Sequence, residues 1–206
     1  MKEMLIHDYQ FKEDQVTFLP NCKKDEFLNQ LEKILPSKST SQTRLLIWVI
    51  SHGTVDKTIE FSDAPVQADD IWNRLGKKKG DGSYSFECKQ ILFVIDACYS
   101  GAMIKDGQEE YNPSRSVCDA VEAGSRIVVT STSFETTRES QFTREFLKQL
   151  TINSKPYLTI DKLFDESRKE FLKSNSGNTN PRLTIFDDVN HQDKGSYLFI
   201  KKKFFK

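Results

Sequence analysis

Two reactive side chains follow two short apolar runs in this chain. The run at 44–50 (RLLIWVI) ends two residues before His52, and the run at 91–95 (ILFVI) ends three residues before Cys98. A glycine follows each reactive residue within three positions. If both runs are neighbouring strands of a parallel sheet, their carboxyl ends share the edge where ligands bind. An imidazole would then lie beside a thiol, as an acid–base partner for a nucleophile.

The chemistry available to such a pair is acyl transfer. A free cysteine has a pKa of roughly 8.5, and a histidine within reach can take its proton and later protonate a leaving amine. Acyl transfer also needs hydrogen-bond donors for the oxyanion, and the backbone amides of Gly53 and Cys98 are the candidates. Gly53 has no side chain, so its backbone can approach a substrate closely.

Asp96 precedes Cys98 by two positions. Residues spaced by two along a strand point to the same side, so we expect the Asp96 carboxylate beside the thiol, where it would bind a cationic substrate side chain. A cap or turn ligand for the following segment is the alternative. Taken singly, a histidine at a strand end is more often a surface residue, and a cysteine there is more often a small core residue. The combination favours catalysis.

Strands and helices alternate along most of the chain. Apolar runs predict strands at 16–19, 44–50, 91–95, 126–130, 183–186 and 197–200. Apolar residues at helical spacing predict helices from about 27 to a stop before Pro36, at 68–75, at 114–122, around 142–150 and around 160–172. This alternation predicts an α/β fold with a mainly parallel sheet and helices on both faces. Residues 102–113 lack periodic apolar residues and are expected to form an exposed loop.

Composition narrows the function further. The chain has 30 basic and 30 acidic residues, so nothing indicates a nucleic-acid or anionic-membrane partner. The longest apolar run, at 45–50, is far shorter than the ~18 residues of a membrane span, and no signal peptide is visible. Four cysteines without a CxxC pattern predict neither a disulfide scaffold nor zinc. We therefore expect a cytoplasmic protein with no metal and no cofactor, calcium dependence being left open.

The two motifs resemble those of a known family. An apolar strand before Ser51-His52-Gly53 and another before Asp96-Ala97-Cys98-Tyr99-Ser100-Gly101 are similar to the catalytic signatures of the caspase-like cysteine proteases. In caspases the histidine lies about 50 residues before the cysteine, and here the separation is 46 positions, 98 − 52. The aspartate favours the metacaspase, paracaspase and bacterial caspase-like branch, because animal caspases carry glutamine there. The resemblance covers roughly residues 14–201.

The resemblance implies one caspase-like peptidase domain over residues 1–206, with 202–206 as a tail. The first strand and helix of the family are expected to be absent, since the chain starts near the end of that helix. A missing amino-terminal segment or a partner subunit would fill the gap. The implied activity is an endopeptidase that cuts protein or peptide substrates after Arg or Lys, with His52 and Cys98 as the catalytic dyad and Asp96 as the selector. Three residues are expected to line the site by pairing with an extended substrate: Ser131, Thr132 and Ser133.

Two further expectations concern maturation and a rival function. Relatives are often cut in the loop after the cysteine, so the resemblance implies self-cleavage after Lys105 or Arg115. The rival is a catalytically silent caspase-like scaffold or regulatory module. An intact His52 and Cys98 argue against this rival, and the missing first strand argues for it.

Overall fold

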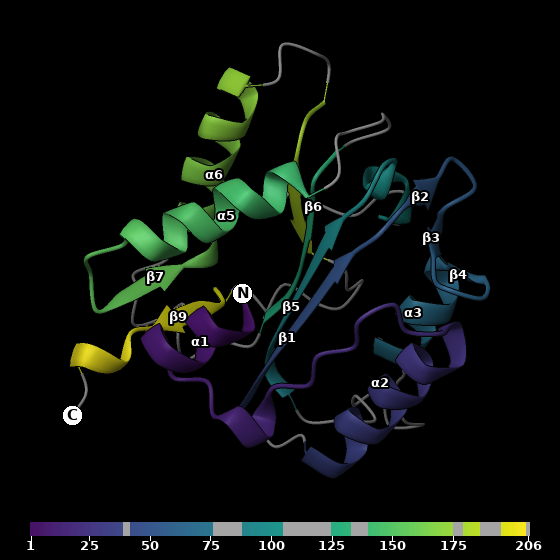
Figure 1. The fold of residues 1–206 in the computed structure, drawn as a ribbon, viewed down its shortest axis with the longest axis horizontal. Coiled ribbons are helices and arrows are strands. Elements are labelled where there is room, and N and C mark those ends of the chain that lie inside the picture. Colours follow the sequence, from purple (N-terminus) through teal and green to yellow (C-terminus); the bar gives the residue numbers. More distant parts are fainter. Residues whose placement is uncertain are drawn as a thin grey trace.

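A computed structural model describes residues 1–38, 42–75, 88–104, 125–132, 140–174, 179–185 and 195–204 (Figure 1). The order of the main sheet is β1-β5-β6-β8. Three parallel strands, β1 (Thr43–Ile50), β5 (Cys88–Asp96) and β6 (Ser125–Thr130), confirm the predicted strands at 44–50, 91–95 and 126–130. The fourth, β8 (Arg182–Ile185), runs antiparallel to β6.

Helices cover both faces of this sheet (Figure 1). One face carries α2 (Lys24–Lys38) and α3 (Ala68–Leu75), and the other carries α1 (Lys2–Asp8), α5 (Gln141–Ile152) and α6 (Ile160–Ser174). Along β5, Phe93 packs on the first side and Val94 on the second. Successive side chains of a strand alternate between faces, so a strand covered on both sides becomes one continuous apolar run. The predicted α/β class is confirmed.

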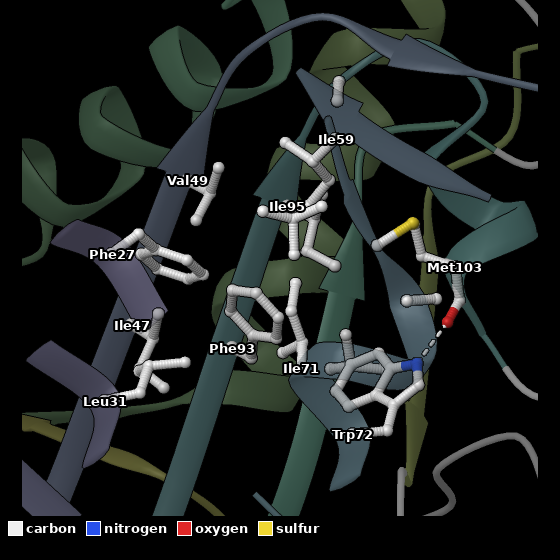
Figure 2. Close-up of a cluster of buried hydrophobic side chains, with 14 of the residues drawn as sticks. Phe27, Leu31, Ile47, Val49, Ile59, Ile71, Trp72, Phe93, Ile95 and Met103 are labelled. Carbon is white, nitrogen blue, oxygen red and sulfur yellow. Dashed lines mark hydrogen bonds between the residues drawn. The ribbon is translucent and has the colours of Figure 1, made fainter. Parts of the chain in front are cut away.

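The core beneath α2 and α3 reaches the segment that follows Cys98 (Figure 2). The ring of Trp72 in α3 meets that of Phe93 edge-on, with 5.6 Å between centroids. Its Nε1 donates a hydrogen bond of 2.6 Å to the carbonyl oxygen of Met103. Met103 closes η2 (Ser100–Met103), a short 3-10 helix. Trp72 therefore ties the chain after the cysteine to α3.

Some sequence predictions differ from the structure near the amino terminus. The predicted strand at 16–19 is wrong: η1 (Glu13–Gln15) precedes it, the chain there has no sheet partner, and Phe18 is 64% exposed. The helix expected to stop before Pro36 continues to Lys38. A proline inside a helix loses one backbone hydrogen bond and crowds the carbonyl four residues earlier, so it weakens the helix without always ending it.

The structure also has short strands that the sequence did not predict, and one predicted strand lies outside the main sheet. An antiparallel meander follows His52, formed by β2 (Gly53–Thr54), β3 (Thr58–Glu60) and β4 (Pro65–Gln67), whose strands are too short to show alternation. The late strand β9 (Leu198–Ile200) pairs with β7 (Tyr157–Thr159) in a separate two-stranded sheet, and η3 (Lys202–Phe204) follows it. The helix expected at 114–122 lies outside the described residues.

The amino-terminal helix is fixed through one buried tyrosine. Tyr9 follows α1, is 0% exposed, and donates a hydrogen bond of 2.6 Å from its hydroxyl to the carbonyl oxygen of Leu150 in α5. Lys201 lies over the Tyr9 ring and donates to the carbonyl oxygen of Asn153, just past the end of α5. A cation at the C-terminus of a helix is favourable, so this cluster joins both chain ends to α5.

We predict that Tyr9→Phe lowers the free energy of unfolding by about 1–2 kcal/mol, because a buried carbonyl loses its donor. Urea denaturation measures the change. Tyr157→Phe removes the same hydroxyl from a side chain that is 40% exposed and should change stability little. Equal effects of the two substitutions would contradict the anchoring role of Tyr9.

Candidate active site

The carboxyl ends of β1 and β5 bring the two reactive segments together. The two strands pair in parallel with Ile50 opposite Asp96. The ladder extends one residue further, since the Ser51 N–H donates to the Asp96 carbonyl oxygen at 3.2 Å. His52 follows immediately and is exposed, while Cys98 lies two residues beyond Asp96 and is half-buried. Both residues therefore leave the sheet at the same edge.

Gly53 lies against the backbone of the cysteine segment. A Cβ added to Gly53 would lie 2.1 Å from the carbonyl oxygen of Cys98 and 3.3 Å from the Cβ of Ala97. The first distance is a clash with backbone, which no side-chain rotation can relieve. Only glycine fits here without a shift of the chain. The residue after His52 is thus in direct contact with the residue expected to be the nucleophile.

The meander holds the backbone around His52. The His52 carbonyl oxygen accepts a hydrogen bond from the Glu60 N–H at 2.9 Å, and the Ser51 hydroxyl donates to the Glu60 carbonyl oxygen. Gly53 pairs with Ile59 in the β2–β3 hairpin. The histidine segment is therefore held by β5 on one side and by β3 on the other.

The chain turns sharply at the cysteine. The strand β5 ends at Asp96, and the Ser100 N–H donates to the Ala97 carbonyl oxygen at 3.3 Å. Tyr99 is in the left-handed region, with φ 53°, which is uncommon for a residue with a side chain and concentrates at functional sites. The alternation of a strand therefore does not extend to Cys98, and it does not place Asp96 and Cys98 on one side.

Ser131 and Thr132 support this turn from the neighbouring strand. The Ser131 hydroxyl lies 3.2 Å from both the amide nitrogen and the carbonyl oxygen of Ala97. The Thr132 N–H donates to the Ser100 hydroxyl at 3.2 Å. Both residues are fully buried, so in this structure they hold the turn, and their pairing with substrate stays a prediction.

Three of the residues named from the sequence cannot be placed. Ser133, Lys105 and Arg115 lie outside the described residues.

The Asp96 carboxylate lies on the face of the sheet that α5 covers. It is 2% exposed, and its Oδ2 accepts a hydrogen bond of 2.8 Å from the Thr143 N–H, in the first turn of α5. Asp96 is thus a cap, as the alternative interpretation held, although for a helix 47 positions later rather than for the next segment. Among the described residues, Oδ1 has no hydrogen-bond partner.

Burial raises the pKa of Asp96, because it removes water from the charged form. Hydrogen bonds from the Thr143 hydroxyl and amide, and from the Ser131 hydroxyl, lower this pKa without cancelling the rise. The Ser131 hydroxyl is shared with the Ala97 backbone, so Thr143 is the main partner of the carboxylate.

Sequence reasoning did not single out Thr143 or its partner Trp48. The Trp48 Nε1 in β1 donates to the Thr143 hydroxyl at 3.1 Å, across 95 positions of the chain. The sequence places these two residues only in the strand at 44–50 and in the helix around 142–150, without indicating a contact between them. The one local signal is a hydroxyl residue near a helix start, which is common and gives no partner.

No helix in the described parts of the chain is long and apolar enough to cross a membrane. Within the same residues, no group of three or more His, Cys, Asp or Glu side chains could hold a metal ion.

The Gly53 contact generates a prediction. Gly53→Ala should push the histidine and cysteine segments apart, lowering stability by about 1–3 kcal/mol, as overpacking does. A displacement of about 1 Å costs on the order of a hundredfold in rate, so the turnover expected of the His52–Cys98 pair should fall by that order. Turnover and thermal unfolding of the purified variant measure both effects. Asp56→Ala, at the exposed tip of the same hairpin, should leave both unchanged. Full activity of Gly53→Ala would show that the contact is dispensable.

Comparison with known proteins identifies the family and the fold of this chain. The family model of the caspase domain matches residues 1–188. Among solved structures, a chain titled "structure of pro-sf-caspase-1" is similar with a TM-score of 0.51 and 19% identity, over 89% of this chain and 71% of that chain. At this identity the likeness shows the fold alone. No curated protein matches the chain. Because the family model spans most of the sequence, the chain belongs to the caspase family, a family of cysteine peptidases.

Proposed function

We propose that this protein is a cysteine endopeptidase that hydrolyses peptide bonds after Arg or Lys, with Cys98 as nucleophile and His52 as acid–base. The observation that carries the proposal is the contact of Gly53 with the Cys98 carbonyl oxygen, at the ends of two paired parallel strands. Membership of a cysteine peptidase family supports the reaction class.

The proposed reaction has two steps. The Cys98 thiolate attacks the carbonyl carbon of the scissile bond, the C–N bond breaks, and His52 gives its proton to the leaving amine. A water molecule then loses a proton to His52 and attacks the thioester, which releases the carboxylic acid and the cysteine. In both steps the backbone amides of Gly53 and Cys98 are the proposed donors to the oxyanion.

Asp96 is the proposed selector for a basic side chain. A buried carboxylate oxygen without a hydrogen-bond partner is costly, and a guanidinium or ammonium group would supply donors and the opposite charge. The proposal also keeps Ser131, Thr132 and Ser133 as residues that line the substrate, self-cleavage after Lys105 or Arg115, and a cytoplasmic location.

We predict that Cys98→Ala abolishes hydrolysis of peptides containing Arg or Lys, and that His52→Ala does nearly the same. Residues that act as one unit give non-additive losses, so the double variant should be little worse than either single one. Fluorogenic peptides and labelling by a thiol-directed probe measure turnover and nucleophile reactivity. Cys22→Ala, which changes a cysteine that packs against the α2–α3 core, should retain activity. Turnover that persists in Cys98→Ala would refute the mechanism, and a silent wild type without labelling would favour the scaffold function.

A separate prediction concerns specificity. Asp96→Asn removes the charge from a charge-assisted hydrogen bond worth ~1.5–3 kcal/mol, so kcat/KM for basic peptides should fall about tenfold to a hundredfold. Asp161→Asn is the matched control, because Asp161 also accepts a hydrogen bond, from Ser196, but belongs to α6. An enzyme that cuts after Asp or after neutral residues would contradict the selector role.

A further inference from the structure

The start of α5 lacks a cap from its own sequence. Ser140 occupies the cap position, yet its backbone is left-handed with φ 56°, and its side chain makes no capping hydrogen bond. The first N–H groups of a helix have no partner within the helix. One of them, the Thr143 N–H, is satisfied by Asp96 at the end of β5. The orientation of the Asp96 carboxylate is therefore coupled to the start of α5.

The Thr143 hydroxyl also links the start of α5 to β1. It accepts a hydrogen bond from the Trp48 indole, and the residue is 4% exposed. A hydroxyl that accepts from an indole keeps one hydrogen to donate, and the Thr143 hydroxyl is among the groups that hold the pKa of Asp96 down. The contacts from Trp48 to Thr143 and from Thr143 to Asp96 thus join β1, α5 and β5. The hydrogen-bonding groups of Thr143 and Ser131 that lower the pKa of Asp96 are uncharged.

The two carboxylate oxygens are used differently. Thr143 holds Oδ2, while Oδ1 is buried and has no hydrogen-bond partner among the described residues. An ionised carboxylate oxygen accepts hydrogen bonds, so Oδ1 has the capacity to accept from a ligand donor. A carboxylate fixed through one oxygen presents the other in one direction only.

We propose that Thr143 is a positioning residue for substrate recognition: it fixes Oδ2 of Asp96 so that Oδ1 is presented to the cationic side chain before the scissile bond. This inference rests on the proposed preference for Arg or Lys. Thr143 itself touches neither the substrate nor the reacting atoms, and it acts through Asp96.

The test uses the whole chain with Thr143→Val, which keeps the backbone donor and the side-chain shape but removes the hydroxyl. KM for an Arg peptide should rise about tenfold with little change in kcat, which is the loss expected when one hydrogen bond to a charged group is weakened. Thr143→Ser should restore the wild-type KM. A purely structural threonine would instead lower stability and leave KM unchanged, and that result would overturn the inference.

Folding of the valine variant needs its own safeguard. The Trp48 indole loses its acceptor there, so the double variant Trp48→Phe/Thr143→Val removes donor and acceptor together and should fold. Its KM should rise by the same factor. A double variant with wild-type KM would also overturn the inference.

A second readout separates this inference from the proposed specificity. Titration of the Asp96 carboxyl carbon by NMR should show a higher midpoint in Thr143→Val than in the wild type, whichever peptide is cut. A wild type that does not cut basic peptides, together with this shift, would refute the specificity and retain the Asp96–Thr143 coupling. Identical midpoints in the two proteins would overturn the coupling itself.

Discussion

The parallel pairing of β1 with β5 is the constraint on which the site depends. Each strand is a separate apolar run, and their register places Ile50 opposite Asp96. The two segments that follow these strands therefore leave the sheet at the same edge. The space between them is then so narrow that Gly53 meets the Cys98 carbonyl oxygen. The meander behind His52 and the hydroxyls of Ser131 and Thr132 are secondary supports, because each holds one of the two segments in the place that the register defines.

The supports of the cysteine turn come from both faces of the sheet. On one side, Trp72 of α3 binds the carbonyl oxygen of Met103 in η2. On the other side, the Asp96 carboxylate accepts a hydrogen bond from the Thr143 N–H at the start of α5. A turn that contains a left-handed Tyr99 is costly by itself, so it persists where its surroundings hold it. The two helical layers thus contribute to the site although neither carries His52 or Cys98.

The sequence predicts the frame of this site better than its details. Strands such as β5 are covered on both faces and become unbroken apolar runs, and α3, α5 and α6 carry clear apolar spacing, so these elements could be located. The strands of the meander have two or three residues and leave no period to detect. The antiparallel direction of β8 relative to β6 could not be predicted either, because an apolar run does not specify which strand it pairs with or in which direction.

Asp96 shows why side-chain placement was harder still. The expectation that it points with Cys98 required the strand to continue for two more residues, and the strand ends at Asp96 itself. Its contact with Thr143 spans 47 positions, and that of Thr143 with Trp48 spans 95. Local patterns cannot indicate such pairs, since they depend on how α5 packs on the finished sheet.

The raised pKa of Asp96 also makes folding proton-linked. A carboxyl with a higher pKa in the folded than in the unfolded chain favours folding below its unfolded pKa, and this stabilisation is lost as pH rises through the folded pKa. In its ionised form Asp96 therefore opposes folding. A cation bound at Oδ1 would offset that cost, and a ligand that binds only the folded state raises its melting temperature. Heat resistance in the presence of a small guanidine compound would then report occupancy of Asp96 without any peptide being cut.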